Sequence, residues 1–255
     1  MADKIALISD VHSNLFALEA VLSDCHKQGV SKIYFLGDVI GYGPKPIECL
    51  DLLMNECEKL AVLGNHDAAF LGGLDFGWDS AIKAKNAIIY ARNLLNYEKY
   101  LKNKISNKYI DWLLNLKPSF RLDENLFVHG SPRDQTYEYL TSHNLPEYKN
   151  IFNEFKHLCF VAHSHIPGLF ARSDKRWYAP KDINHQYYIS DDKAVINIGS
   201  VGQPRDEDPR ACYGIFDGSV FIWRRVEYNI QGTIQQILDI PELDDWLGHR
   251  LLAGK

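Results

Sequence analysis

The sequence lacks the features of membrane, secreted and nucleic-acid-binding proteins. No apolar run is long enough to span a membrane, and no charged segment followed by an apolar one precedes the first expected strand, so we expect neither an anchor nor a signal peptide. The five cysteines are odd in number and form no CxxC pair, which favours reduced thiols in a cytoplasmic protein. Basic residues are not in excess, since 28 Lys and Arg face 33 Asp and Glu. This balance argues against non-specific nucleic-acid binding.

The sequence also shows no internal repeat, low-complexity tract or linker. Its 255 residues, 46% of them hydrophobic, are enough for a sizeable core. We therefore expect one domain over residues 1–255. A net charge of −5 does not exclude a phosphorylated substrate, because bound metal can supply positive charge locally.

The first quarter of the chain predicts an α/β fold. Residues 4–64 alternate strand, helix, strand, helix and strand, with helices expected at Asn14–Lys27 and Pro46–Glu58. Pro46 suits a first helical turn. This alternation is typical of a parallel sheet, with functional loops at the carboxyl ends of its strands.

The rest of the chain predicts an insertion and then a second sheet. Residues 68–117 are expected to form a small insertion of two or three helices that shapes the substrate entrance or a subunit interface. Hairpins are expected over Tyr187–Asn197 and, around the turn pair Asp217-Gly218, over Tyr213–Val226. Closing helices are expected over Asn229–Asp239 and Pro241–Leu252.

Five short segments consist almost wholly of metal-ligating residues, and each follows a run of apolar and β-branched residues. They are Asp10-Val11-His12, Gly37-Asp38, Gly64-Asn65-His66-Asp67, His129-Gly130 and His163-Ser164-His165. Packing does not explain why strand tips would all end in His, Asp or Asn. The pattern predicts one metal centre assembled from several loops.

The candidate ligands supply carboxylate, amide and imidazole donors without any thiolate. They are Asp10, His12, Asp38, Asn65, His129, His163 and His165. Mixed nitrogen and oxygen donors suit Mn, Fe, Zn, Co or Ni ions. Seven groups are too many for one ion that keeps open positions, but they suit two ions that share a carboxylate. Such pairs of ions catalyse displacements at phosphorus.

Local geometry supports this interpretation. In an extended segment alternate residues point to the same side, so Asp10 and His12 could reach one ion. The same rule covers His163 and His165, although a loop could direct them to different ions. Gly37, Gly64 and Gly130 allow close backbone approach or positive φ beside the metals.

Together the five motifs resemble the signature motifs of the calcineurin-like metallophosphoesterases. Longer segments resemble a bacterial and archaeal branch of this superfamily, and the similarity runs from residue 4 to about residue 226. These segments are 10–14, 37–44, 129–134 and 197–206. The resemblance implies a four-layer α/β/β/α sandwich with two mixed β-sheets.

The resemblance also implies roles for individual residues. One ion would be held by Asp10, His12, Asp38 and His165, and the other by Asp38, Asn65, His129 and His163. A hydroxide between the ions would attack phosphorus, and His66 would protonate the leaving oxygen or donate a hydrogen bond to the phosphate.

The chain departs from the superfamily pattern at two places. Ala162 stands where the last motif usually opens with Gly, a small change whose methyl group could crowd the loop. The Asp that partners the catalytic His in protein phosphatases is missing after Asp38, where residues 39–42 are Val-Ile-Gly-Tyr. This absence argues against a protein Ser/Thr phosphatase.

Four further residues are candidates for substrate contact: Tyr42, Arg133, Arg205 and Arg210. Arginines near a metal pair can bind phosphate oxygens in bidentate fashion. Arg205 and Arg210 could equally form structural ion pairs with Asp206 or Asp208. Asp67 could cap the helix that follows it or support the site from behind the ligands.

The expected function is metal-dependent hydrolysis of a phosphorylated small molecule or nucleotide. A phosphodiesterase or pyrophosphatase with two transition-metal ions fits best, and a dinucleoside polyphosphate is one substrate that the resemblance implies. Alternatives are a phosphomonoesterase or protein phosphatase, a non-catalytic protein-binding scaffold, and an iron oxidoreductase. The retained ligands and His66 disfavour the scaffold, and no separate two-His, one-carboxylate set supports the oxidoreductase.

Overall fold

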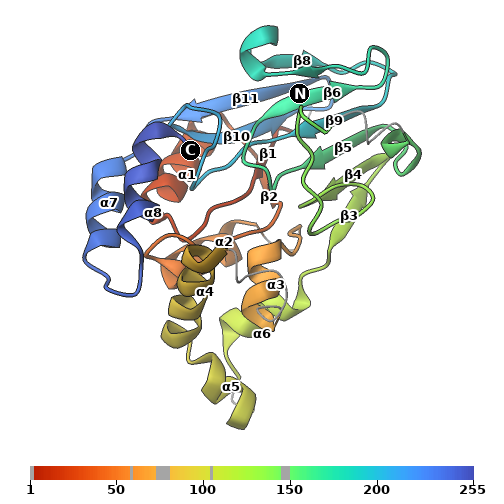
Figure 1. Cartoon of the computed structure of the whole chain (residues 1–255). Helices are drawn as coiled ribbons and strands as arrows, with labels where there is room; N and C mark the ends of the chain where they lie inside the picture. The colour runs from red at the N-terminus through yellow and green to blue at the C-terminus, as the bar shows by residue number, and fades with distance from the viewer. Residues whose placement is uncertain (1–2, 58–59, 73–80, 104–105, 145–149) are drawn as a thin grey trace.

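Two β-sheets lie face to face at the centre of the protein (Figure 1). The structure is a computed structural model, and it describes residues 3–57, 60–72, 81–103, 106–144 and 150–255. In spatial order the first sheet contains β2 (Lys32–Phe35), β1 (Ile5–Ile8), β10 (Ala211–Phe216), β11 (Val220–Val226) and β8 (Gln186–Tyr188). The strands β1 and β2 pair in parallel and the other named pairs of this sheet are antiparallel, so it is mixed.

The second sheet is also mixed. In spatial order it contains β3 (Ser119–Leu122), β4 (Asn125–Val128), β5 (Leu158–Val161), β9 (Ala194–Asn197), β6 (Gly168–Ala171) and β7 (Trp177–Tyr178). The strands β4, β5 and β9 run parallel, and the other pairs are antiparallel. Because β1, β2, β4 and β5 each precede a ligand-rich loop, these loops meet at one edge of the two sheets.

The α-helices lie mainly outside the first sheet. They are α1 (Leu15–Lys27), α2 (Pro46–Glu56), α3 (Asn65–Leu71), α4 (Ile82–Leu94), α5 (Tyr97–Asn103), α6 (Lys108–Asn115), α7 (Ile230–Leu238) and α8 (Asp245–His249). Short 3₁₀ helices are η4 (Ile151–Asn153), η5 (Pro180–Ile183) and η6 (Arg250–Ala253). The helices α4 and α5 extend away from the sheets at the bottom of the view, whereas α7 and α8 lie at one side (Figure 1).

Local sequence explains where the first two helices begin. The Asn14 side chain caps α1 by accepting a hydrogen bond from the Ala17 amide, and the buried face of α1 includes Leu18 and Val21. Pro46 occupies the first turn of α2, where its missing N–H costs nothing. Both helices begin where the sequence predicts.

Three apolar layers hold the fold together. Leu7, Phe127, Phe160 and Ile196 pack between the two sheets. The other face of the first sheet packs against α1, α2 and the helices of the insertion. The outer face of the second sheet is covered by the loop that carries η4. The predicted α/β class with two mixed sheets flanked by helices is confirmed.

Two predictions from the second half have opposite outcomes. The Tyr213–Val226 hairpin is confirmed, since β10 and β11 pair across Asp217-Gly218. The Tyr187–Asn197 hairpin is wrong, because β8 pairs with β11 in the first sheet whereas β9 lies between β5 and β6 in the second.

The third strand expected in the first quarter of the chain, near residues 60–63, forms only isolated bridges at Ala61 and Val62.

The remaining predictions concern the insertion and the chain as a whole. Residues 82–115 contain α4, α5 and α6, as expected, while 73–80 and 104–105 lie outside the described residues. All five cysteines are buried and free of disulfides. Within the described residues, no helix has both the length and the apolar character needed to span a membrane.

Candidate metal centre

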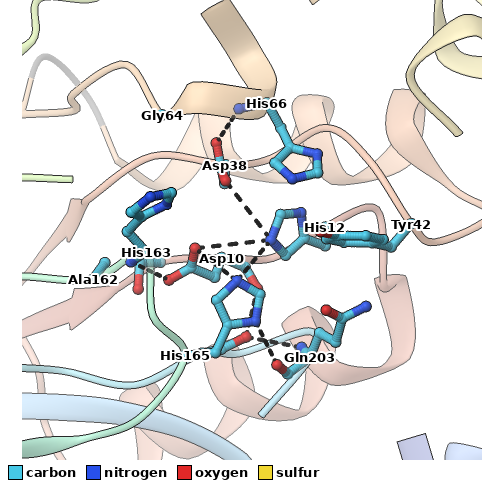
Figure 2. Close-up of polar contacts among 12 residues, drawn as sticks. Asp10, His12, Asp38, Tyr42, Gly64, His66, Ala162, His163, His165 and Gln203 are labelled. Atoms are coloured by element: carbon cyan, nitrogen blue, oxygen red, sulfur yellow. Dashed lines mark hydrogen bonds and ion pairs between the residues drawn. The ribbon is translucent and has the colours of Figure 1, made fainter. Parts of the chain in front are cut away.

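The predicted ligands converge in a buried cluster. Figure 2 shows Asp10, His12, Asp38, His163 and His165 of this cluster. Asp10 and His12 follow β1, and Asp38 follows β2. His129 follows β4, whereas the other two histidines, at 163 and 165, follow β5. Asn65 is the first residue of α3.

One group of ligand atoms surrounds Asp10. His165 Nε2 lies 3.3 Å and His12 Nε2 3.8 Å from Asp10 Oδ1, and the two imidazole nitrogens are 3.1 Å apart. His12 Nε2 also lies 3.8 Å from Asp38 Oδ2. Two ligands bound about 2.1 Å from one ion at ordinary angles are separated by about 3.0 to 3.4 Å. The spacing of this group is therefore close to that of a coordination sphere.

A second group surrounds the same oxygen of Asp38. His129 Nε2 lies 3.3 Å from Asp38 Oδ2 and 3.1 Å from Asn65 Oδ1. His163 joins this group, because its ligand atom lies within 4.8 Å of those of Asp38 and His129. Asp38 Oδ2 is thus common to both groups, and the two histidines after β5 point into different groups.

Hydrogen bonds to backbone carbonyls fix the tautomers of two imidazoles in the first group. His12 Nδ1 donates to the Ile40 carbonyl at 2.9 Å, and His165 Nδ1 donates to the Gln203 carbonyl at 2.6 Å. Since a carbonyl only accepts, both Nε2 atoms of the neutral rings carry lone pairs. These lone pairs face each other at 3.1 Å. Such an arrangement is unfavourable unless a cation or a proton lies between them.

The second group has a similar arrangement. His129 Nδ1 donates to the Leu36 carbonyl at 2.7 Å, which leaves Nε2 facing Asn65 and Asp38. His163 uses the other nitrogen, because its Nε2 donates to the Tyr137 carbonyl at 3.1 Å. His163 therefore presents Nδ1 as its lone pair. Backbone acceptors that orient imidazoles in this way are typical of metal sites.

In Asp10 and Asp38, one carboxylate oxygen accepts a backbone hydrogen bond and the other faces the cluster. Asp10 Oδ2 accepts from the His163 amide, and Asp38 Oδ1 accepts from the His66 amide. Within the described chain, the buried atoms Asp10 Oδ1 and Asp38 Oδ2 accept no hydrogen bond. Buried carboxylate oxygens without a partner are costly unless they coordinate a cation. The donor set and these orphaned oxygens fit bound metal ions.

The electrostatics of the cluster agree with ligand chemistry. Burial lowers the pKa of His12 to about 3 and that of His163 to about 4, so both imidazoles are neutral. Burial opposes the ionisation of Asp38, but His129 and His66 outweigh it, and the pKa of Asp38 lies well below its ordinary value. Burial also opposes protonation of His129, but Asp38 raises the pKa of His129 to about 9. Ionised Asp38 thus draws positive charge into the second group.

The backbone beside the cluster is not extended, contrary to the prediction. Positive φ angles of 48°, 47°, 64°, 64° and 60° are found at Asp10, His12, Asp38, His163 and His165. The alternation rule for strands therefore does not explain how these side chains converge. Each left-handed residue costs about 1–2 kcal/mol, and such strain is concentrated at functional sites.

Glycines allow the loops to approach closely. A Cβ atom added to Gly64 would lie 2.0 Å from Asp38 Oδ1, and one added to Gly37 would lie 2.7 Å from Gly64 Cα. Gly37 also has a φ of +89°. The predicted reason for these two glycines, close backbone approach beside Asp38, agrees with this geometry.

Asp67 supports the loop that carries Asp38. Its carboxylate accepts from the amides of Asp38, Val39 and Ile40 at 2.8, 3.1 and 3.1 Å, and from the Gly64 amide at 3.3 Å. Asp67 therefore serves both roles considered from the sequence, because it caps α3 and also supports the site.

His66 packs against both His12 of the cluster and Tyr42. Its ring centre is 4.7 Å from the ring centres of both His12 and Tyr42 (Figure 2). A Cβ added to Gly41 would lie 2.4 Å from His66 Nδ1, so the Nδ1 edge of the imidazole ring packs on the backbone of Gly41. Gly41 and Tyr42 therefore contact His66. They lie in the segment where a protein phosphatase would carry the Asp that partners its catalytic His.

Ala162, the other departure from the superfamily pattern, causes no visible crowding. Its methyl group is buried in the apolar layer between the sheets. Its amide donates to the His129 carbonyl at 2.9 Å, and its carbonyl accepts from Asn197 Nδ2 at 2.8 Å. The loop is therefore anchored on both sides of this residue.

The four candidate substrate residues differ in their surroundings. Tyr42 packs against His12 at 4.6 Å, and Arg205 Nη2 donates to the Tyr42 hydroxyl at 3.2 Å. Arg210 is exposed and forms an ion pair with Asp208, the structural alternative considered above. Arg133 is exposed and pairs with Glu138.

One aromatic residue at the site gave no signal in the sequence. The Tyr139 ring stacks on the His163 ring with centres 3.8 Å apart. Tyr139 lies in an irregular loop, ten residues after His129, with no periodicity or motif to single it out. Its position follows only from the path of that loop over the cluster.

Comparison with known proteins identifies the family. The sequence model of the calcineurin-like phosphoesterases matches residues 3–197. An uncharacterized protein of Methanocaldococcus jannaschii is 36% identical over 255 residues, with 98% of each chain covered.

Solved structures agree with this match. A metallophosphoesterase from Sphaerobacter thermophilus is 34% identical, with a TM-score of 0.82 and all of both chains covered. A hypothetical protein from Pyrococcus horikoshii shares the fold at 18% identity and a TM-score of 0.70, covering 99% of this chain and 98% of that one. The chain therefore belongs to the calcineurin-like phosphoesterase family and is a metal-dependent phosphoesterase.

Proposed function

We propose that this chain is a dinuclear phosphohydrolase that cleaves a phosphodiester or phosphoanhydride bond in a small molecule or nucleotide. The observation that carries the proposal is the pair of buried ligand groups that share Asp38 Oδ2. Asp10, His12, Asp38 and His165 would hold one ion. Asp38, Asn65, His129 and His163 would hold the other.

The ligand types limit the identity of the ions. Four imidazoles, two carboxylates and an amide suit Mn, Fe, Zn, Co or Ni. When bound, such ions would lower the pKa of water and neutralise charge that develops at phosphorus. The carbonyls of Ile40, Gln203, Leu36 and Tyr137 would keep the imidazoles in the ligating tautomer.

His66 is proposed as the proton or hydrogen-bond donor to the leaving oxygen. Its Nδ1 edge packs against Gly41, so Nε2 is the nitrogen that we assign to the contact with substrate. Burial lowers the pKa of His66 well below its ordinary value, so the ring is neutral before an anionic substrate arrives. A nearby phosphate would favour its protonation, because an opposite charge stabilises the imidazolium.

Metal content and hydrolysis of model substrates test the proposal. Protein purified without chelators is expected to carry, or accept on reloading, two ions per chain. It is expected to hydrolyse bis(p-nitrophenyl) phosphate with Mn²⁺, the first ion to try. A protein that binds no metal after reloading would favour the non-catalytic scaffold instead.

Replacement of His66 tests its role separately. His66→Ala should lower kcat roughly a hundredfold or more while the metal content stays the same. His26→Ala, which removes an exposed surface histidine, is the matched control and should keep full activity. Unchanged turnover in His66→Ala would show that another group donates the proton.

A further inference from the structure

Arg205 is partly buried at the site without a carboxylate partner. Its Nε and Nη2 atoms donate to Gln203 Oε1 at 3.2 and 2.7 Å, and Nη2 also donates to the Tyr42 hydroxyl. In the described part of the chain, no Asp or Glu oxygen lies within 4.0 Å of its guanidinium nitrogens. By contrast, neighbouring Arg210 and Arg225 pair with Asp208 and Asp206. Even a partly buried cation with only neutral partners loses hydration, and a ligand that supplies negative charge would offset this cost.

The backbone and the ring of Tyr42 hold Arg205 beside the cluster. The Arg205 amide donates to the His165 carbonyl at 3.1 Å. The guanidinium carbon lies 5.7 Å from the centre of the Tyr42 ring, which in turn lies 4.6 Å from the His12 ring. The positive charge of Arg205 is therefore about one aromatic ring away from the candidate ligands.

Two further residues complete this flank. Tyr139 stacks on His163 and its hydroxyl interacts with Arg205, so Arg205 contacts tyrosines that pack on both ligand groups. Arg250 of η6 lies nearby, since burial and the charge of Arg205 lower the pKa of Arg250 to about 10. The positive charges of Arg205 and Arg250 repel each other, and an anion bound to Arg205 would reduce this repulsion.

We propose that Arg205, Tyr42 and Tyr139 bind a second phosphoryl group, so that the preferred substrate is a phosphoanhydride such as a nucleoside diphosphate. This inference rests on the proposed function. The ligand cluster would take the scissile phosphate. A simple diester has one negative charge and would leave Arg205 without a counter-charge, whereas an anhydride carries a second charge beside the first.

The position of Arg205 also suits the reaction products. Water adds to the scissile phosphorus, and the bond from that phosphorus to the bridging oxygen breaks. The leaving phosphate keeps the electron pair, and the proton lost by water passes to the leaving oxygen or to solvent. Arg205 would stabilise the negative charge that grows on this leaving phosphate.

Competing substrates test the inference. Wild type, Arg205→Gln and Tyr139→Phe, all loaded with Mn²⁺, are assayed on ADP and on bis(p-nitrophenyl) phosphate. Arg205→Gln should lower kcat/KM for ADP at least ten times more than for the diester, and Tyr139→Phe should shift the ratio in the same direction. Arg172→Gln, which breaks the exposed Arg172–Asp192 pair, is the control and should leave the ratio unchanged.

Equilibrium binding gives a second measurement that does not need turnover. Methylenediphosphonate should bind the Mn²⁺-loaded wild type more tightly than methylphosphonate does, and Arg205→Gln should reduce this preference at least tenfold. Thermal melts and metal content show whether each variant is folded and loaded.

Two results with Arg205→Gln would overturn the inference. One is an equal loss on both substrates in Arg205→Gln, and the other is an unchanged preference for the diphosphonate. Hydrolysis of the diester without any turnover of ADP would also reject it, while leaving the proposed function intact. If neither substrate is hydrolysed with any metal, the proposed function fails, and the binding preference still decides the role of Arg205.

Discussion

The floor and the rim of the site are built in different ways. The floor consists of the seven candidate ligands, Asp10, His12, Asp38, Asn65, His129, His163 and His165, which are all buried. The rim consists of Tyr42, Tyr139 and Arg205, which are partly or largely exposed. Backbone amides and carbonyls orient most of the floor, whereas side chains orient the rim. We therefore propose that the floor serves the chemistry and that the rim selects the substrate.

The largest effect is expected from crowding the floor. In Gly64→Ala the new methyl group would collide with Asp38 Oδ1 at 2.0 Å and displace the shared carboxylate. Misplacement of a reacting group by about 1 Å can cost roughly a hundredfold in rate. We expect at least this loss in kcat, together with reduced metal content by elemental analysis.

Gly218→Ala is the matched control for this crowding. Gly218 has a φ of +89° in the β10–β11 turn, but no atom lies within 4 Å of an added Cβ. This variant should lose some stability and keep its activity and metal content. Equal activity in the two variants would show that the floor tolerates displacement of Asp38.

A smaller effect is expected from the support beneath the floor. Asp67→Asn replaces one oxygen with an NH₂ group that faces backbone N–H donors, so hydrogen bonds to Asp38, Val39 or Ile40 are lost. Loss of such support behind metal ligands typically costs roughly 10–100-fold in metal affinity or activity. Metal titrations and urea unfolding of the apo protein would measure both consequences. Loss of stability without loss of metal affinity would assign Asp67 to capping of α3 alone.

The rim should respond more weakly. Tyr42→Phe keeps the ring that packs on His12 and His66 but removes the hydroxyl that accepts from Arg205. A lost hydrogen bond of about 1 kcal/mol corresponds to roughly a fivefold change, which we expect mainly in KM. Tyr42→Leu also removes the ring and should lower kcat as well. If the two variants behave alike, the ring has no positioning role.

The smallest effect on activity is expected away from both regions. Asp24 of α1 accepts from Arg224 at 2.6 Å and from Tyr213 at 2.7 Å. Burial opposes its ionisation, but these hydrogen bonds outweigh it and lower the pKa of Asp24 below 3.8. The stabilisation is therefore present above pH 3.8 and is lost as the pH falls through the lower, folded-state pKa.

Unfolding experiments at two pH values would check this. Asp24→Asn should lower the free energy of unfolding by about 1 kcal/mol at pH 7, with kcat unchanged. The difference should shrink as the pH falls below 3.8. A difference that stays constant with pH would show that packing, not charge, stabilises this contact.

The same contrast explains what the sequence could predict. The floor residues follow apolar runs that predict strands, and strand ends meet at a sheet edge. The sequence could therefore predict that these residues form one site. The left-handed backbone at Asp10 and His12 was not visible, because local patterns do not report φ. The contact between Tyr139 and Arg205 depends on the path of two loops, and no residue spacing in the sequence predicts it.

The wrong hairpin has a related cause. Tyr187 and Tyr188 pair with β11, while the buried residues Ala194–Asn197 fit between β5 and β6. Alternation and turn residues identify strands, but they do not specify which neighbour a strand will choose. The Asp217-Gly218 pair was informative because its turn joins two strands directly.

The positive φ angles of five candidate ligands have a consequence for redesign of the metal preference. Asn, Asp and His are the non-glycine residues that most often adopt this conformation, and they are also the residue types of the candidate ligands. Coordination chemistry and backbone geometry thus select the same short list of amino acids. An exchange such as Asp10→Glu or His12→Cys would meet a conformational barrier in addition to a chemical one. Recruiting a different ion to this scaffold would therefore have to start with the loops, before the donor atoms.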